Sequence, residues 1–371
     1  MKKALTLTTY DVYNYGASLQ AYALQQYLIA LGLESELINY QPEYLRRKYD
    51  YKWVNPESSL SKFWITRIAY RIMKYLQRQT TMGRKKSFDK FHNTFLKQSV
   101  PYYNYKELAQ NPPTGDFYIV GSDQIWNTFY ETGRDGAFYL DFVKNGVKAS
   151  YSASFSYTEI SKEWKDKISF WLKDFKNIAV REYHGVEILK GMGFESTWVL
   201  DPVFLLSESC WKKIMLPVKN KKPYILVYDF ESNKEIERFC KEYAKNKGLK
   251  IYSINDTYPR LYADRNFSSA GPQEFLSLIY NCDAFVSNSF HGTAFSIMFQ
   301  KPVFVFNRNR HKVNSRMESL TKMFGLKNCI VPEGFNIENY INMPFDYNKI
   351  GQIRKNELNK SKEYINRLLY S

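Results

Sequence analysis

Cysteine and histidine are scarce in this chain of 371 residues, which has four of each. The cysteines (Cys210, Cys240, Cys282 and Cys329) lie far apart, and none belongs to a CxxC pair. This spacing excludes a zinc finger, and isolated thiols are typical of a reduced cytosolic protein. The histidines show no ligand spacing with one another, so we expect no metal site.

Long apolar runs are also absent from the sequence. No stretch approaches 20 unbroken apolar residues, so we expect no transmembrane helix. Residues 1–10 carry two lysines but alternate apolar and polar residues, without an apolar core or a small-residue cleavage site. They therefore predict a strand rather than a signal peptide, and a cytoplasmic protein.

Acidic residues are outnumbered, with 37 Asp and Glu against 53 Lys and Arg, which gives a net charge of +16. Such an excess favours a polyanionic partner, either nucleic acid or an anionic membrane surface. The alternative is a generally basic protein from a lysine-rich genome. No recognition motif for nucleic acid accompanies the charge, which is concentrated in one segment, so we expect no nucleic-acid partner.

That segment, residues 44–92, contains thirteen lysines and arginines among many aromatic residues. Apolar residues recur every four positions within it, and a strip of cations runs beside them. The two sets are Leu60, Trp64, Ile68, Ile72 and Leu76, and Arg67, Arg71, Lys74 and Arg78. This pattern is typical of an amphipathic helix that lies on anionic lipid, here the inner membrane leaflet. The alternative is a helix packed on its own domain, with a solvated basic face.

Apolar runs of strand length alternate with helical patterns along most of the chain. The opening β-α-β unit has a polar turn that contains Asn14 and Gly16. This turn is neither a GxGxxG nor a Walker loop, so it does not indicate a dinucleotide or ATP site. A second β-α series starts near Tyr224. We therefore predict an α/β fold of two doubly wound parallel sheets that face each other across a cleft.

The predicted division has three parts. Residues 1–205 form an N-terminal domain with a basic, aromatic helical insertion at about 44–110. Residues 206–345 form a C-terminal domain, and residues 346–371 form a helix that packs back toward the N-terminal domain.

Residues 283–299 predict a strand, a polar turn and a helix, with His291 at the start of the helix. The first turn of such a helix has unpaired N–H groups at the carboxyl edge of a sheet, where anions bind. An imidazole there can exchange protons near neutral pH. The alternative is a histidine that only caps the helix or packs beside Phe290.

Two further polar side chains follow strands of the first half. Asp123 comes after residues 117–120, and could orient a sugar hydroxyl, act as a base, pair with a cation or only cap the next turn. Arg181 follows residues 178–180, and its planar guanidinium suits a carboxylate or phosphate. We expect Asn14, Asp123, Arg181 and His291 to face one cleft.

Five motifs, in order along the chain, resemble the polysaccharide pyruvyl transferase family. They are Asn14-Tyr-Gly16-Ala-Ser-Leu-Gln20, Gly121-Ser122-Asp123-Gln-Ile-Trp126, Val180-Arg181-Glu182, Asp201-Pro202 and Ser289-Phe-His291-Gly292. The resemblance implies two Rossmann-like domains arranged as in GT-B glycosyltransferases. It also implies transfer of the pyruvyl group of phosphoenolpyruvate to two hydroxyls of one sugar, which forms a carboxyethylidene ketal and releases phosphate.

The resemblance also suggests roles for residues. It implies that His291 is the acid–base residue and that Arg181 holds the donor, and Asp123 completes the predicted catalytic set. Many members carry an arginine two residues before the histidine, where this chain has Ser289, so Arg316 or Arg308 is expected to meet the donor's charge. The predicted substrate-binding residues are Asn14, Gly16, Gln20, Ser122, Ser289, Gly292 and Arg316.

The expected acceptor is a sugar of a bacterial surface-polysaccharide precursor, such as a lipid-linked oligosaccharide of capsule or exopolysaccharide synthesis. The basic segment would help to reach it at the inner leaflet. No cofactor is expected besides phosphoenolpyruvate, which is the donor substrate. The alternative on the same architecture is a glycosyltransferase with a nucleotide-sugar donor, although no acidic residue of the second half is obviously placed to hold a ribose.

Overall fold

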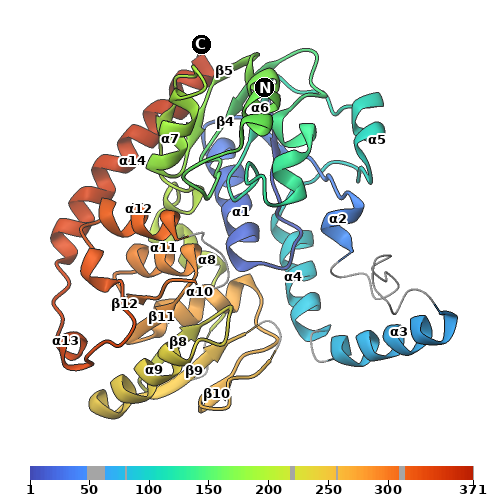
Figure 1. Ribbon diagram of the computed structural model, residues 1–371. Coiled ribbons are helices and arrows are strands. Elements are labelled where there is room, and N and C mark those ends of the chain that lie inside the picture. Colours follow the sequence, from blue (N-terminus) through green and yellow to red (C-terminus); the bar gives the residue numbers. More distant parts are fainter. Residues whose placement is uncertain (48–62, 80–81, 218–221, 256–257, 309–313, 371) are drawn as a thin grey trace.

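The computed structural model describes residues 1–47, 63–79, 82–217, 222–255, 258–308 and 314–370. These residues build two five-stranded sheets, one from each half of the chain, and a two-stranded sheet (Figure 1). All strand pairs in the sheets are parallel. The predicted fold class, with two doubly wound α/β sheets, is confirmed.

The first sheet has the strand order β2-β1-β3-β4-β5. Its strands are β1 (Lys3–Leu7), β2 (Glu34–Leu37), β3 (Phe117–Val120), β4 (Val147–Ser150) and β5 (Phe175–Asn177). The two-stranded sheet follows along the chain and consists of β6 (Ala179–Val180) and β7 (Thr197–Trp198). Helix α1 (Tyr15–Ala30) begins at Asn14, whose side chain accepts a hydrogen bond from the Ala17 amide and so satisfies one free N–H of the first turn.

The second sheet has the order β10-β9-β8-β11-β12. Its strands are β8 (Tyr224–Tyr228), β9 (Lys250–Ile254), β10 (Arg265–Asn266), β11 (Ala284–Ser287) and β12 (Val303–Val305). Its helices are α9 (Lys234–Lys247), α10 (Pro272–Asn281), α11 (Phe290–Met298) and α12 (Ser315–Met323). Every residue of β8 and β11 is buried, as expected for central parallel strands covered on both faces.

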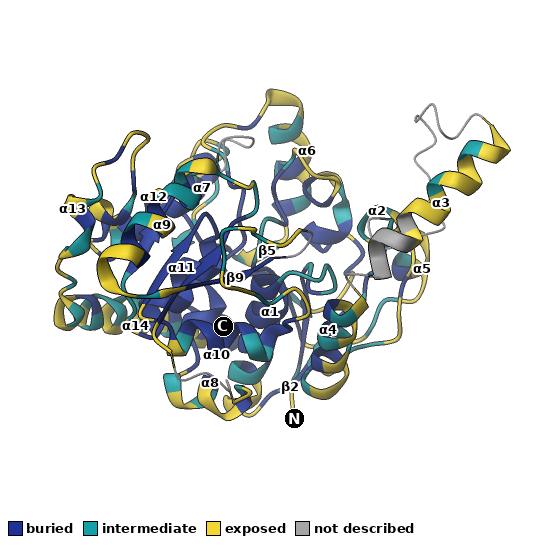
Figure 2. Ribbon diagram, turned by 90° about the horizontal axis from the view of Figure 1, so that it is seen from below, coloured by how far each residue is buried: buried dark blue, intermediate teal, exposed yellow. Residues whose placement is uncertain are grey.

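The remaining helices connect or cover the two sheets. They are α2 (Glu43–Arg46), α3 (Trp64–Gln79), α4 (Met82–Phe95), α5 (Tyr105–Gln110), α6 (Lys162–Leu172), α7 (Tyr183–Lys190), α8 (Glu208–Ile214), α13 (Glu338–Ile341) and α14 (Tyr347–Tyr370). Short 3-10 helices are η2 (Glu131–Arg134), η3 (Gly136–Tyr139), η4 (Pro202–Phe204) and η5 (Lys327–Cys329). Figure 2 shows that the sheets and α11 lie in the buried interior, whereas most of α3 is exposed.

Most predicted elements agree with the structure, and residues 117–120, 224–228 and 250–254 agree in full. Residues 148–154 alternate apolar and polar residues, which predicts a strand over that range, but the observed strand β4 ends at Ser150. Ser152 has a φ of 58°, outside the extended region, so the chain leaves the sheet there.

The two halves of the chain are packed against each other. The ring of Tyr15, in α1, stacks on Phe275 of α10 with centroids 4.4 Å apart, and its hydroxyl donates to the Ala270 carbonyl. Helix α14 runs from the second half back along the first (Figure 1). There Tyr364 packs in a cluster that includes Leu24, and its hydroxyl donates to the Ser150 carbonyl. These contacts hold the strand ends of the two sheets in fixed positions.

Candidate active site

His291 lies at the start of α11, directly beyond the end of β11. Ser289 caps this helix, because its hydroxyl accepts a hydrogen bond from the Gly292 amide. The helix is buried along its whole length, and His291 is only 6% exposed. The predicted strand–turn–helix unit is therefore present and holds the imidazole in a fixed place.

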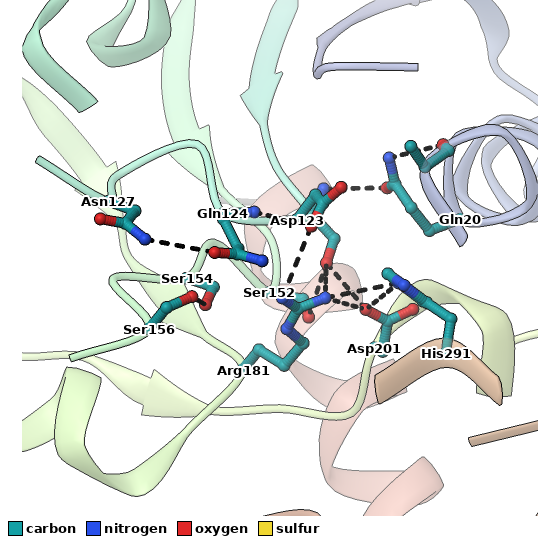
Figure 3. A network of polar contacts seen from close by, with 12 residues as sticks. Gln20, Asp123, Gln124, Asn127, Ser152, Ser154, Ser156, Arg181, Asp201 and His291 are labelled. Atoms are coloured by element: carbon teal, nitrogen blue, oxygen red, sulfur yellow. Dashed lines mark hydrogen bonds and ion pairs between the residues drawn. The ribbon is translucent and has the colours of Figure 1, made fainter. Parts of the chain in front are cut away.

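Residues from three strand ends of the first half converge on this imidazole (Figure 3). The Oδ2 atom of Asp201 accepts hydrogen bonds from Arg181 Nη1 at 2.8 Å and from Ser122 Oγ at 2.9 Å. The same oxygen lies 3.3 Å from Nε2 of His291. Arg181 Nη1 is 3.4 Å from Nε2. The guanidinium and the imidazole, contributed by opposite halves of the chain, thus meet at one buried carboxylate.

The carboxylate of Asp201 is almost completely buried, at 1% exposure. Burial alone would raise its pKa, but His291 and Arg181 outweigh this effect and hold the pKa well below its usual range. Nε2 of His291 is within reach of both groups: it can donate a hydrogen bond to Oδ2 of Asp201 when it carries a proton, or accept one from Nη1 of Arg181 when it does not.

Gly16 provides the space that the imidazole occupies. A Cβ atom at this position would lie 1.9 Å from Nδ1 of His291 and 2.2 Å from Cγ. Any side chain there would displace the ring. Gly16, predicted to bind substrate, therefore lies against His291 and permits the close approach of α1 and α11.

Gln20 was also predicted to bind substrate, and the structure places it elsewhere. Its amide nitrogen donates to Thr8 Oγ1 and to the Ala17 carbonyl, and its oxygen accepts from the Ser122 amide at 3.0 Å. Gln20 is completely buried. It supports the turn that carries Ser122 because both ends of its amide are used within the protein.

A cavity of about 270 Å³ opens beside His291. Its lining comes from both halves of the chain: Val12, Tyr13, Asn14, Arg84, Asp123, Gln124, Tyr130, Tyr228, Phe230, Asn288, Ser289, Phe290, His291, Arg308 and Arg316. Five of the predicted residues are in this set. The other five, namely Gly16, Gln20, Ser122, Arg181 and Gly292, do not line the cavity.

The lining is rich in arginine. Arg316 is 6% exposed, and burial, with the nearby charge of Arg181, lowers its pKa to about 10, so it stays charged at neutral pH. The Nε atoms of Arg181 and Arg316 are buried, and within the described residues neither has a hydrogen-bond partner. Asp123 Oδ1 lies 3.8 Å from Arg181 Nη2. Buried guanidinium groups with unused donors favour an anionic ligand.

No group of three or more His, Cys, Asp or Glu side chains that could hold a metal ion occurs in the described part of the chain.

The family model for polysaccharide pyruvyl transferases matches residues 14–310. The chain belongs to this family. The resemblance noted in the sequence is therefore confirmed, and the protein is a transferase of polysaccharide synthesis. No curated protein sequence matched the chain.

Several solved structures are similar to this chain at low sequence identity. UDP-GlcNAc 2-epimerase from Neisseria meningitidis, bound to UDP-GlcNAc, has a TM-score of 0.51 and 13% identity, and the match covers all of both chains. The enzyme from Methanocaldococcus jannaschii has a TM-score of 0.50 and 13% identity, also over all of both chains. The E. coli heptosyltransferase WaaC with ADP has a TM-score of 0.42 and 8% identity, over 84% of this chain and 89% of that one. At such identities the epimerases share the fold alone.

Arg84 is a cavity residue of this pyruvyl transferase family member that sequence reasoning did not single out. It lies in α4, is 4% exposed and donates to the Tyr13 carbonyl at 2.9 Å. Its guanidinium sits 4.2 Å from the centre of the Tyr15 ring. Arg84 is one of the thirteen lysines and arginines of residues 44–92, and no motif or periodic position distinguishes it from the others in the sequence.

Asp201 is also absent from the predicted site residues, although Asp201-Pro202 is one of the five motifs. A usable signal was present: the aspartate follows β7 just as Asp123 follows β3 and Arg181 follows β6. Polar residues just beyond the carboxyl ends of parallel strands are candidates for a site, so the same argument applied to all three.

Proposed function

We propose that this protein transfers the pyruvyl group of phosphoenolpyruvate to two hydroxyls of one sugar in a lipid-linked precursor of a bacterial surface polysaccharide. The observation that carries the proposal is a small cavity bordered by buried arginines beside an imidazole that is paired with a carboxylate. In this proposal the cavity binds the donor, and the acceptor sugar reaches it from the open side.

The charges of the cavity suit such a donor. Phosphoenolpyruvate is a compact trianion, and Arg84, Arg308 and Arg316 line the cavity, with Arg181 behind them. Asp123 is the single acidic residue among the described lining residues. Arg84 and Arg316 are in a position to supply the positive charge that other family members place two residues before the histidine. We infer that they compensate for Ser289.

The volume also favours a compact ligand. A cavity of about 270 Å³ lies just below the range of roughly 300–1,000 Å³ that is usual for sites of drug-sized ligands. A nucleotide sugar would need considerably more space than phosphoenolpyruvate.

The chemistry needs one acid and one base. In the proposed first step, protonated His291 gives a proton to the methylene carbon of the donor, which becomes a methyl group and leaves an oxocarbenium-like carbon. One sugar hydroxyl forms a bond to this carbon and loses its proton to Asp123. The second hydroxyl then forms the other C–O bond as the bond to phosphate breaks, and its proton leaves with the phosphate.

Asp201 contributes without touching the substrate. Its carboxylate contacts both His291 and Arg181 and keeps these two side chains aligned. Holding the donor and both hydroxyls in register would lower the barrier further, because well-oriented groups react without a further loss of translational freedom.

The direct test is phosphate release from phosphoenolpyruvate in the presence of candidate acceptor sugars. We expect release that depends on acceptor, and loss of release in His291→Ala with the fold retained. His184→Ala, a half-buried histidine outside the cavity lining, is the matched control and should stay active. Background release with every pyruvylatable sugar, alongside an active control enzyme, would contradict the proposal. So would tight calorimetric binding of UDP, GDP or CMP.

A further inference from the structure

Helix α3 exposes large apolar side chains that the active site does not use. Phe63, just before the helix, and Trp64, Ile65, Ile68 and Ile72 within it are between 46% and 71% exposed. Figure 2 shows the helix projecting from the body of the protein, with most of its surface exposed. Exposed apolar groups gathered on one element mark an interaction surface more often than chance exposure does.

The exposed apolar residues share one side of the helix. Trp64, Ile68 and Ile72 are spaced by four residues, which places them along one stripe, and Ile65 adjoins it. Arg67 and Arg71, also exposed, form the neighbouring strip. Such a surface combines an apolar stripe with a cationic flank.

Acidic residues are missing from this region of the sequence. Helix α3 has none, and none occurs from Ser58 to Phe88, a stretch that contains eight lysines and arginines. A second copy of the helix would bring cations against cations, without the opposite charges that pair helices in coiled coils. A negatively charged surface is therefore the complementary partner.

We propose that α3 docks flat on an anionic lipid bilayer. Its apolar stripe would enter the boundary between headgroups and acyl chains, while Arg67 and Arg71 contact acidic headgroups. The helix has 16 residues and so measures about 24 Å, which is short for a membrane crossing. Among the described residues no helix is long and apolar enough to span a membrane, which fits docking at the surface.

The docking helix is linked to the active site through α4, which starts three residues after α3 ends. Helix α4 is anchored by the buried side chains of Phe88 and Phe91, and its Arg84 lines the cavity. Helix α3 therefore leads directly, along the chain, into the helix that contributes Arg84 to the cavity. The consequence that the acceptor is delivered on a lipid rests on the proposed function, whereas the docking itself does not.

Co-flotation of the purified protein with vesicles tests the docking without any substrate. We expect binding to vesicles of phosphatidylcholine with 30% phosphatidylglycerol, roughly tenfold weaker binding to phosphatidylcholine alone, and loss of binding at high salt. The variant Trp64→Asp/Ile68→Asp should reduce binding at least about tenfold, because charges cannot enter the headgroup boundary. Phe170→Asp/Leu261→Asp, at two exposed apolar residues elsewhere, is its control and should bind normally.

A second pair of variants tests the charge. Arg67→Glu/Arg71→Glu should weaken binding to the anionic vesicles about tenfold or more. Lys144→Glu/Lys327→Glu makes the same change in net charge at exposed positions outside α3 and should have little effect. Equal losses in both charge variants, or binding unaffected by the α3 variants, would overturn the proposal. Self-association without vesicles that Trp64→Asp/Ile68→Asp abolishes would also overturn it and assign the surface to a second copy.

Discussion

The contact between Gly16 and His291 leads to a sharp prediction for Gly16→Ala. The added Cβ would lie 1.9 Å from Nδ1 of the imidazole, whereas an ordinary van der Waals contact starts at 3.4 Å. The ring must therefore move by at least about 1.5 Å, or α1 and α11 must separate by that amount. Either movement breaks the 3.3 Å contact between His291 Nε2 and Asp201 Oδ2.

The expected effect of Gly16→Ala is larger on catalysis than on stability. A displacement of about 1 Å in a catalytic group lowers the rate about a hundredfold, so kcat for phosphate release should fall by at least that factor. Overpacking of this kind typically lowers the free energy of unfolding by about 1–3 kcal/mol. Phosphate release measures the first quantity, and urea unfolding measures the second.

Gly351→Ala is the matched control for this substitution. Gly351 lies in α14, where an added Cβ meets nothing within 4 Å, so alanine should leave kcat unchanged and slightly stabilise the helix. A Gly16→Ala protein with the kcat of the wild type would show that the imidazole can move without loss of activity, and that its contact with Gly16 does not fix its position for catalysis.

Two other substitutions test the charges around the cavity. Asp201→Asn leaves Arg181 without its buried counter-charge and should lower the free energy of unfolding by roughly 3–5 kcal/mol, as measured in urea at pH 7. Because the folded protein lowers the pKa of Asp201, the stability its charge contributes is complete above the ordinary carboxyl pKa of about 3.9 and declines below it. The difference between wild type and variant should therefore shrink on acidification, and a difference that grows would contradict the assignment. Arg84→Gln should raise KM for phosphoenolpyruvate about tenfold, whereas the neighbouring exposed Lys86→Gln should not; equal KM values for both variants would exclude Arg84 from donor binding.

Much of this site follows from strand ends alone. The sequence predicted that polar residues after the apolar runs at 117–120, 178–180 and 284–286 would gather in one place. Asp123, Arg181 and His291 do so, although β3, β6 and β11 belong to three different sheets, because the carboxyl ends of these strands meet where the two halves of the chain pack together. The predicted strands that match the structure best are the fully buried apolar runs, because a strand covered on both faces needs apolar side chains at every position.

The other features of the site depend on how distant segments pack, and a pattern of residue types along the chain does not show this packing. Arg84 enters the cavity because α4 folds back against the Tyr15 ring, a contact between positions 69 residues apart. Gly16 and Gln20 matched a motif, yet the structure uses them to clear space and to hold a turn. A motif identifies which residues matter, whereas the role of each residue depends on which neighbours it meets in three dimensions.

Calorimetric titration with phosphoenolpyruvate, in the absence of acceptor, tests most directly whether the arginine-lined cavity is the donor site. We expect one saturable site in the wild type. Because a hydrogen bond to a charged group contributes about 1.5–3 kcal/mol, Arg316→Gln should bind the donor roughly ten- to a hundredfold more weakly. If phosphoenolpyruvate fails to bind the wild type, or binds Arg316→Gln equally well, the arginine-lined cavity is not the donor site.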